Sequence, residues 1–176
     1  AKMKRFLAVL LSCFAFAGCA TMNKPEPLPA TVGRLDLDRF MGDWYVIAAV
    51  PTLADKQAYN MVQTYQRAER GIEVVYRFNK GAPNGKEKSY TSRVMIDNPG
   101  LNTDWTVRRQ WPFNVDHRVL YLEPDYSVAV IGHPNRENVW IISRQPEMSA
   151  PLYSDIILKL QNLGYDIGKI RRIPHR

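Results

Sequence analysis

The feature that most constrains the fold is a series of short β segments that recurs through most of the chain. Between residues 44 and 143, runs rich in Val, Ile, Tyr and Trp alternate with turn formers such as Asn98-Pro99-Gly100 and Glu123-Pro124-Asp125. A spacing of roughly 8–12 residues between strands is typical of an antiparallel barrel or sandwich. The expected strands cover residues 44–50, 59–68, 72–78, 90–96, 105–110, 118–122, 128–131 and 139–143.

One helix is expected after the last of these strands. Ser149 is placed to cap its N-terminus, Pro151 lies in its first turn, and Gly164 ends it. Because the helix follows a complete set of strands, we expect it to pack on the outside of the β-domain. Its apolar positions have helical spacing: Leu152, Ile156, Ile157, Leu160 and Leu163.

The N-terminal segment has the composition of a secretory signal. Lys2, Lys4 and Arg5 precede an uncharged apolar run over residues 6–17, which is followed by Gly18-Cys19. The run is shorter than the roughly 20 apolar residues that a spanning helix needs. The sequence therefore predicts a signal peptide over residues 1–18.

Phe16-Ala17-Gly18-Cys19 resembles the lipobox of bacterial lipoproteins, although Phe16 stands where Leu is usual. The resemblance implies cleavage before Cys19 and acylation of this residue. Ala20, in place of an Asp, implies the outer membrane, with the protein facing the periplasm. Residues 19–33, with three alternating prolines, are expected to form an extended tether. The alternative is an ordinary signal peptide that leaves a soluble periplasmic protein.

Three motifs in the body of the chain resemble those of the lipocalin family. The motifs are Gly42-Asp43-Trp44-Tyr45, Asp125-Tyr126, and Trp140 to Arg144, with Pro124 where the second family motif has Thr. Trp111-Pro112-Phe113 and Gly132-His133-Pro134 are similar to the bacterial branch, close to apolipoprotein D. The resemblance covers about residues 34–174 and implies an all-β fold for residues 34–176. That fold is an eight-stranded up-and-down antiparallel β-barrel with one C-terminal α-helix packed outside.

The family resemblance assigns structural roles to these motifs. It places the Trp44 side chain across the closed end of the barrel with the Arg144 guanidinium on its face, a cation–π pair worth about 0.5–2 kcal/mol. Gly42 allows a tight bend at that end.

Strand alternation then predicts which side chains point inward, starting from Trp44 and Arg144. The third strand is ambiguous, because a bulge could exchange its two faces. The candidate ligand-binding residues are Val46, Ala48, Met61, Tyr65, Tyr76, Trp105, Val107, Arg109, Val119, Tyr121 and Trp140.

The resemblance also implies a fatty acid or lysophospholipid ligand. An anionic head group would favour a cation near the barrel opening, and Arg77, Arg93 and Arg109 lie on expected strands. Arg109 shares its parity with Trp105 and Val107, so we expect it to point inward; an outward, solvated Arg is the alternative.

Other classes of function have weaker support. The basic residues are scattered, so no nucleic-acid partner is expected. Both cysteines, Cys13 and Cys19, precede the body of the chain. The three histidines lie far apart in sequence, without the short spacing of metal ligands: His117, His133 and His175. No metal or cofactor is therefore expected. No catalytic residue is assigned. The alternative, an enzyme acting on lipids in a lipocalin-like barrel, needs polar, titratable groups inside the cavity, and a triad of a Ser with Asp116 and His117 is one possible arrangement. A non-binding envelope scaffold and a homodimer remain alternatives.

Overall fold

The computed structural model describes residues 26–30, 32–110 and 113–176, without the side chains of residues 109, 110 and 113. The expected signal peptide, Cys19 and the first part of the expected tether therefore lie outside the described residues, as do Trp111 and Pro112. In the described ranges, no helix has the length and apolar character to span a membrane.

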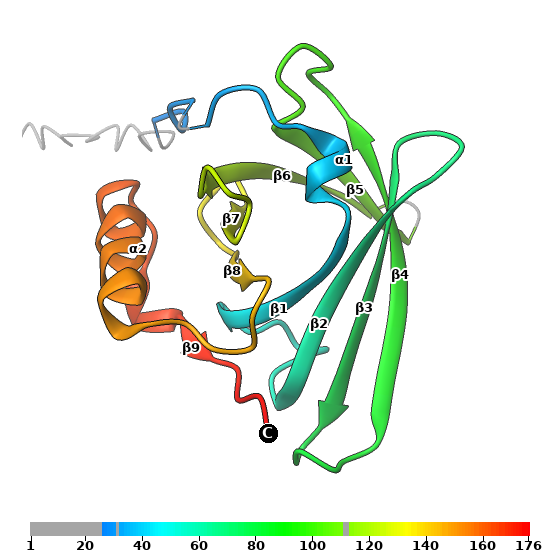
Figure 1. Ribbon diagram of the computed structural model, residues 1–176, viewed down its shortest axis with the longest axis vertical. Helices are drawn as coiled ribbons and strands as arrows, with labels where there is room; N and C mark the ends of the chain where they lie inside the picture. Colours follow the sequence, from blue (N-terminus) through cyan, green and yellow to red (C-terminus); the bar gives the residue numbers. More distant parts are fainter. Residues whose placement is uncertain (1–25, 31, 111–112) are drawn as a thin grey trace, which may run out of the picture.

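Within the described residues, eight antiparallel strands close into a barrel in chain order (Figure 1). β1 pairs with β8 on one side and with β2 on the other, so the barrel has no free edge. This confirms the expected fold class. The strands are β1 (Gly42–Ala49), β2 (Ala58–Arg67), β3 (Ile72–Lys80), β4 (Glu87–Ile96), β5 (Asp104–Gln110), β6 (Phe113–Leu122), β7 (Val128–Gly132) and β8 (Val139–Ser143).

Several elements differ from the sequence expectation. β4 begins at Glu87, earlier than predicted, because its first three residues are exposed and polar and show no alternation. β6 begins at Phe113, also earlier than predicted, although Asn114 and Asp116 alternate with Phe113 and Val115. Three further elements are too short to produce a periodic pattern: α1 (Leu37–Phe40), the 3-10 helix η1 (Ile167–Lys169) and β9 (Arg171–Arg172), which pairs with β1. Asp36 caps α1, since its carboxylate accepts hydrogen bonds from two backbone N–H groups.

The two ends of the barrel differ. We call the end covered by α1, where β1 begins and β8 ends, the floor. The opposite end, formed by the loops over residues 50–57, 81–86 and 133–138, is the mouth. The expected helix is α2 (Ala150–Asn162), which starts and ends close to the predicted residues. Ser149 occupies the N-cap position, but its side chain makes no capping hydrogen bond.

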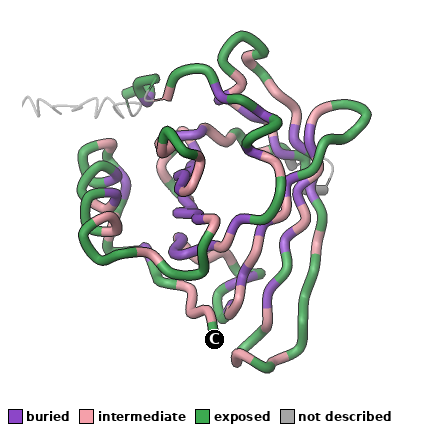
Figure 2. The backbone as a smooth tube through the Cα atoms, viewed as in Figure 1, coloured by how far each residue is buried: buried purple, intermediate pink, exposed green. Residues whose placement is uncertain are grey.

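Buried apolar side chains form two clusters, one inside the barrel and one outside. The inner cluster contains Trp44, Val46 and Ile142, and the outer cluster packs Ile156 and Leu160 of α2 against β7 and β8. Figure 2 shows that the side of α2 facing the barrel is buried or half-buried, whereas its opposite side is exposed. The strands of this wall are apolar on both faces because one face packs inside the barrel and the other packs against α2.

Two bulges reverse the side-chain directions predicted for Ala48 and Tyr121. The ladder shifts register between Val46 and Ala48, and again between Val119 and Tyr121. Because one extra residue exchanges the faces of a strand, Ala48 and Tyr121 belong to the outer cluster. Their predicted inward direction is wrong, and Ala49 points inward in place of Ala48.

Candidate functional site

Trp44 and Arg144 close the floor as predicted. The Arg144 guanidinium lies 3.8 Å from the centre of the Trp44 ring. It also donates hydrogen bonds to three backbone carbonyls, those of Asp43 at 2.8 Å, Arg39 at 2.8 Å and Met41 at 2.9 Å. Burial lowers the pKa of Arg144, opposed by the nearby Asp43 carboxylate. The pair therefore joins α1 to the start of β1 and the end of β8.

The other two motifs also contact the floor. Gly42 has a φ of +98°, and a Cβ atom there would meet an Arg144 nitrogen at 3.3 Å. Hydrogen bonds from the Ser127 side chain and then from its backbone N–H lower the pKa of the exposed Asp125 carboxyl. The Tyr126 hydroxyl accepts a hydrogen bond from the backbone N–H of Asp36 at 2.9 Å. These contacts have a structural role.

The interior next to the floor is filled by aromatic rings. Phe40 lies between the rings of Trp44, Tyr65 and Trp105, with ring centroids 4.8, 5.1 and 5.5 Å away. Desolvation by burial raises the pKa of Tyr65 well above its usual value. Met61 is fully buried in the same cluster. The inward direction predicted for Tyr65, Trp105 and Met61 is therefore confirmed, but these side chains pack against one another.

The interior toward the mouth is more polar. The Tyr76 and Tyr90 rings are stacked with centroids 4.5 Å apart, and the Nε2 atoms of His117 and His133 lie 3.0 Å apart. Trp140 packs against both histidine rings. A small cavity of about 20 Å³ is lined by these residues together with Thr52, Val107, Val115 and Asn138.

Sequence reasoning predicted only part of this mouth-side set. Tyr76, Val107 and Trp140 were expected to point inward, and the packing confirms this, as it does for Val46 and Val119. His117 was not expected inside. Its parity with Val119 would have revealed its direction had the sixth strand been extended to residue 113. His133 follows the end of β7, so alternation along the predicted strand did not reach it.

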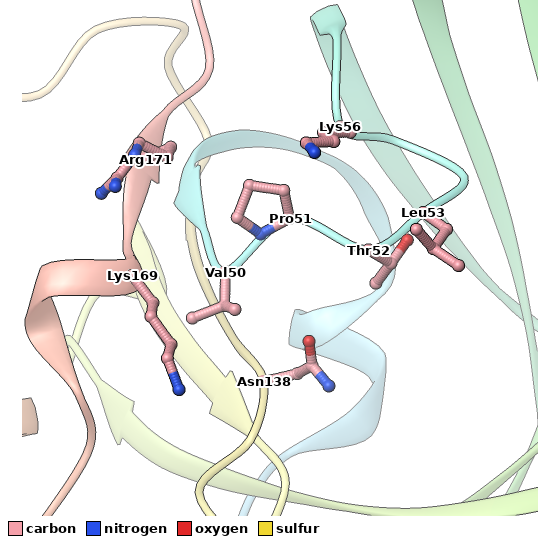
Figure 3. A pocket seen from close by; sticks show the side chains of 8 residues that line it. All are labelled: Val50, Pro51, Thr52, Leu53, Lys56, Asn138, Lys169 and Arg171. Carbon is pink, nitrogen blue, oxygen red and sulfur yellow. The ribbon is translucent and has the colours of Figure 1, made fainter.

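A larger groove, of about 820 Å³, lies outside the barrel at the mouth. Figure 3 shows Lys169 and Arg171 on one side of it and the loop of Thr52 and Leu53 on the other. Thr52 and Asn138 line both the groove and the small cavity, so these two residues lie between the two spaces. The lining of the mouth groove is Val50, Pro51, Thr52, Leu53, Lys56, Asn138, Lys169 and Arg171.

The strand arginines do not supply a described cation inside the barrel. Arg77 is exposed and lies 3.9 Å from the exposed Asp43 carboxylate, and Arg93 is also exposed. The side chain of Arg109 lies outside the described residues, while the ladder shifts register between Arg108 and Gln110. The inward direction of Arg109 stays a prediction. Cations at the mouth come instead from Lys56, Lys169 and Arg171.

The described residues do not form the catalytic triad that an enzyme of this kind could use. Asp116 is exposed, and neighbouring residues on a strand point to opposite faces, so Asp116 and His117 do not form the pair that a triad would need. The described residues contain no group of three or more His, Cys, Asp or Glu side chains that could bind a metal ion.

Comparisons with known proteins agree with this architecture. A family described as a lipocalin-like domain matches residues 35–175. Temperature-induced lipocalin-1 of Arabidopsis thaliana is 32% identical over 149 residues, which cover 80% of this chain and 79% of the relative. Outer membrane lipoprotein Blc of Escherichia coli K12 is 24% identical over 166 residues, which cover 93% of this chain and 92% of the relative. Insecticyanin from the tobacco hornworm Manduca sexta has a similar structure, with a TM-score of 0.62 and 18% identity. The match covers 81% of this chain and 82% of insecticyanin.

Proposed function

The chain belongs to the lipocalin-like family, and on that premise we propose that it binds one single-chain lipid, a fatty acid or a lysophospholipid, through the barrel mouth. Lipocalins bind small hydrophobic molecules and are generally not enzymes. We place this protein at the periplasmic face of a bacterial outer membrane, anchored by acylated Cys19, where it stores or carries such lipids for envelope maintenance.

The observation that supports lipid binding best is the difference between the two ends of the barrel. Trp44 and Arg144 close the floor, whereas at the mouth Thr52 and Asn138 lie between the mouth groove and the small cavity. We infer that movement of side chains at this point opens a passage through which a molecule enters the interior, tail first. Each methylene that leaves water gains about 0.8 kcal/mol, so about ten methylenes would gain about 8 kcal/mol before the costs of ordering.

The mouth groove suits an anionic head group. Lys56, Lys169 and Arg171, which we call the groove cations, line it without a carboxylate among the described lining residues. Lys169 also lies 3.5 Å from Asp166, but both side chains are largely exposed. A carboxylate or phosphate could therefore form charge-assisted hydrogen bonds while its tail passes between Thr52 and Asn138.

Lipid binding requires side chains near the mouth to move. The small cavity of about 20 Å³ has room for about one water molecule, whereas ligand pockets usually measure about 300–1,000 Å³. The Tyr76–Tyr90 stack and Trp140 border this cavity, so their displacement would open the interior at the mouth. We therefore expect the acyl chain to take the place of these rings and leave the packed floor unchanged.

Contacts of the tether support an anchored arrangement with the mouth near the membrane. The Glu26 carbonyl accepts a hydrogen bond from Arg136, which belongs to a mouth loop. Leu28 is buried in the outer cluster, and its carbonyl accepts a hydrogen bond from Arg118 at 2.6 Å. Residues 19–25 can span at most about 25 Å, so an anchor at Cys19 would keep the mouth close to the bilayer.

Displacement of a fluorescent fatty acid from the full chain in detergent tests the binding proposal. We expect palmitate and a lysophospholipid to compete, and Asn138→Trp to weaken binding at least tenfold by blocking the passage. Glu137→Trp is the matched control, because Glu137 is exposed in the same loop and does not line the groove. Unchanged affinity in Asn138→Trp would contradict the passage. Absence of binding to the unmodified chain would favour the scaffold alternative.

Labelling cells with an alkyne fatty acid tests the anchor separately. We expect the label on the unmodified chain and on Cys13→Ser, and none on Cys19→Ser. Cys13 is the appropriate control because it lies in the expected signal peptide and would be removed with it. Label that persists in Cys19→Ser, or a lack of label on the unmodified chain, would rule out acylation at this residue.

A further inference from the structure

We propose that His117 and His133 form a binding site for a divalent transition-metal ion, Cu²⁺ most strongly, inside the mouth half of the barrel. The two side chains come from β6 and from the residue after β7, and His133 is only 9% exposed. Neither the family resemblance nor the lipid proposal requires two histidines that converge at this point.

The distance between the ring nitrogens matches that of two histidines on one metal ion. The Nε2 atoms lie 3.0 Å apart. With metal–nitrogen bonds of about 2.0–2.1 Å, two imidazoles on one ion have their nitrogens about 2.9 Å apart at a right angle and about 3.3 Å apart at the tetrahedral angle. The ring centroids are 4.8 Å apart, so the rings are inclined to the line that joins the nitrogens. A small displacement of the rings would admit an ion between them.

The surrounding structure positions both rings before any ion binds. The backbone N–H of His133 donates to the Asn138 carbonyl at 2.9 Å, and the His133 carbonyl accepts from the Tyr165 hydroxyl at 2.7 Å. The backbone of His117 lies opposite Trp105 in the ladder. The Trp140 ring lies 5.0 Å from the His117 ring and 5.5 Å from the His133 ring. Preorganised ligands lower the cost of binding.

The site has space for further ligands and a route of access. The cavity of about 20 Å³ beside the histidines can contain about one water molecule, which would complete part of the coordination shell. The hydroxyl of Thr52 and the amide of Asn138 border the same cavity, and both also line the mouth groove. An ion can therefore reach the histidines from the mouth.

The chemistry of two imidazoles determines the preferred ion. Imidazole suits copper, zinc and nickel, and affinity in this series is highest for Cu²⁺. Without metal, one histidine donates its Nε2–H to the other. On metal binding this donor moves its proton to Nδ1, so that both Nε2 atoms present lone pairs. Water or an anion fills the remaining positions, because the described residues provide no third ligand of the His, Cys, Asp or Glu type here.

Titration of the full chain in detergent, without added lipid, tests the site. We expect one equivalent of Cu²⁺ by calorimetry, an electron paramagnetic resonance spectrum with coupling to two nitrogens, and quenching of tryptophan fluorescence. His117→Gln and His133→Gln should each weaken binding at least about tenfold. Trp140→Phe should lose much of the quenching, since Trp140 is the ring against the pair.

His175→Gln is the matched control. The Nε2 of His175 lies 2.9 Å from the Val46 carbonyl, away from the pair, so this variant should bind Cu²⁺ as the unmodified chain does. Circular dichroism of each variant confirms that it is folded; the second histidine variant provides the test if the first fails to fold. Lack of Cu²⁺ binding at roughly 100 µM would overturn the proposal. Equal binding by the unmodified chain and folded His117→Gln or His133→Gln would also overturn it.

Discussion

Replacement of Arg144 by Ala should destabilise the fold strongly and leave the binding region near the mouth unchanged. In the structure, the Arg144 guanidinium stacks on Trp44 and donates to the carbonyls of Asp43, Arg39 and Met41. One side chain therefore connects α1, β1 and the end of β8. Truncation removes all of these contacts at once and leaves three carbonyls without this donor.

The size of the effect follows from these contacts. A hydrogen bond that involves a charged group contributes about 1.5–3 kcal/mol, and a cation–π contact contributes about 0.5–2 kcal/mol. The contributions share one side chain and are not additive, and water can reach part of this half-buried site. We therefore expect a loss of about 3–5 kcal/mol in the free energy of unfolding. For a domain of this size, that corresponds to a fall of about 10–15 °C in Tm.

Chemical denaturation of the full chain, followed by circular dichroism, measures this loss. Arg77→Ala is the control, because its exposed ion pair with Asp43 at 3.9 Å should contribute less than about 1 kcal/mol. Arg144→Lys should fall between Ala and the unmodified chain, since an ammonium lacks the planar fork that reaches several carbonyls. A loss below 1 kcal/mol for Arg144→Ala would refute the assignment of the floor to this residue. A large loss of fatty-acid affinity in the folded variant would refute the separation of floor and mouth.

Three further predictions concern the walls and the mouth. Burial, and then the hydrogen bond and charge of Glu123, raise the pKa of Tyr121 to about 12. The contribution of Tyr121 to the stability of the fold is therefore complete below pH 10 and is lost between pH 10 and 12. Denaturation across this range should show that loss in the unmodified chain and not in Tyr121→Phe. Conversion of the three groove cations to Gln should weaken palmitate binding at low salt about tenfold, with little effect on a neutral acyl ester measured by the same displacement assay. Leu28→Asp should detach the tether from the barrel wall, which limited proteolysis would report as faster cleavage before residue 33; an unchanged rate would mean that this contact does not restrain the tether.

The closed end of the barrel could be predicted from the sequence because its parts are local motifs. Gly42 and Trp44 lie two residues apart, and Arg144 ends the last strand, so the resemblance to lipocalins fixed their roles without knowledge of register. Alternation gave the correct inward direction for Val46 for the same reason, since Val46 lies two residues from Trp44 on the same strand. The directions of Val107 and Val119 were also correct, because the apolar alternation of their own strands is regular up to these residues. Such predictions succeed where no insertion separates the reference from the target.

Bulges and pairs of distant residues could not be predicted in this way. The directions of Ala48 and Tyr121 depend on single extra residues in β1 and β6, and nothing in the local sequence distinguishes these from regular strand. His117 and His133 are separated by 16 positions, and their contact depends on the pairing of β6 with β7. A rule based on ligand spacing along the chain therefore misses this pair, because the spacing that matters is across the sheet.

The two ends of the barrel differ in the contacts that restrain them. The β2–β3 ladder shifts register between Tyr59 and Val62, and the β5–β6 ladder shifts between Arg108 and Gln110, both near the mouth. The β6–β7 ladder also shifts, toward the floor, between Val119 and Tyr121. Interrupted ladders have fewer backbone hydrogen bonds to break when side chains between them move. The floor, by contrast, is tied by the three carbonyl contacts of Arg144. A lipid that displaces aromatic rings would therefore meet less resistance at the mouth than at the floor. For this reason we expect the acyl chain to stop short of Trp44.

Hydrogen exchange should accordingly be faster in the mouth half of β2 and β5 than in the floor half of β1. Lipid should slow exchange only in the mouth half of β2 and β5. Slower exchange at the floor would mean that the acyl chain penetrates to Trp44.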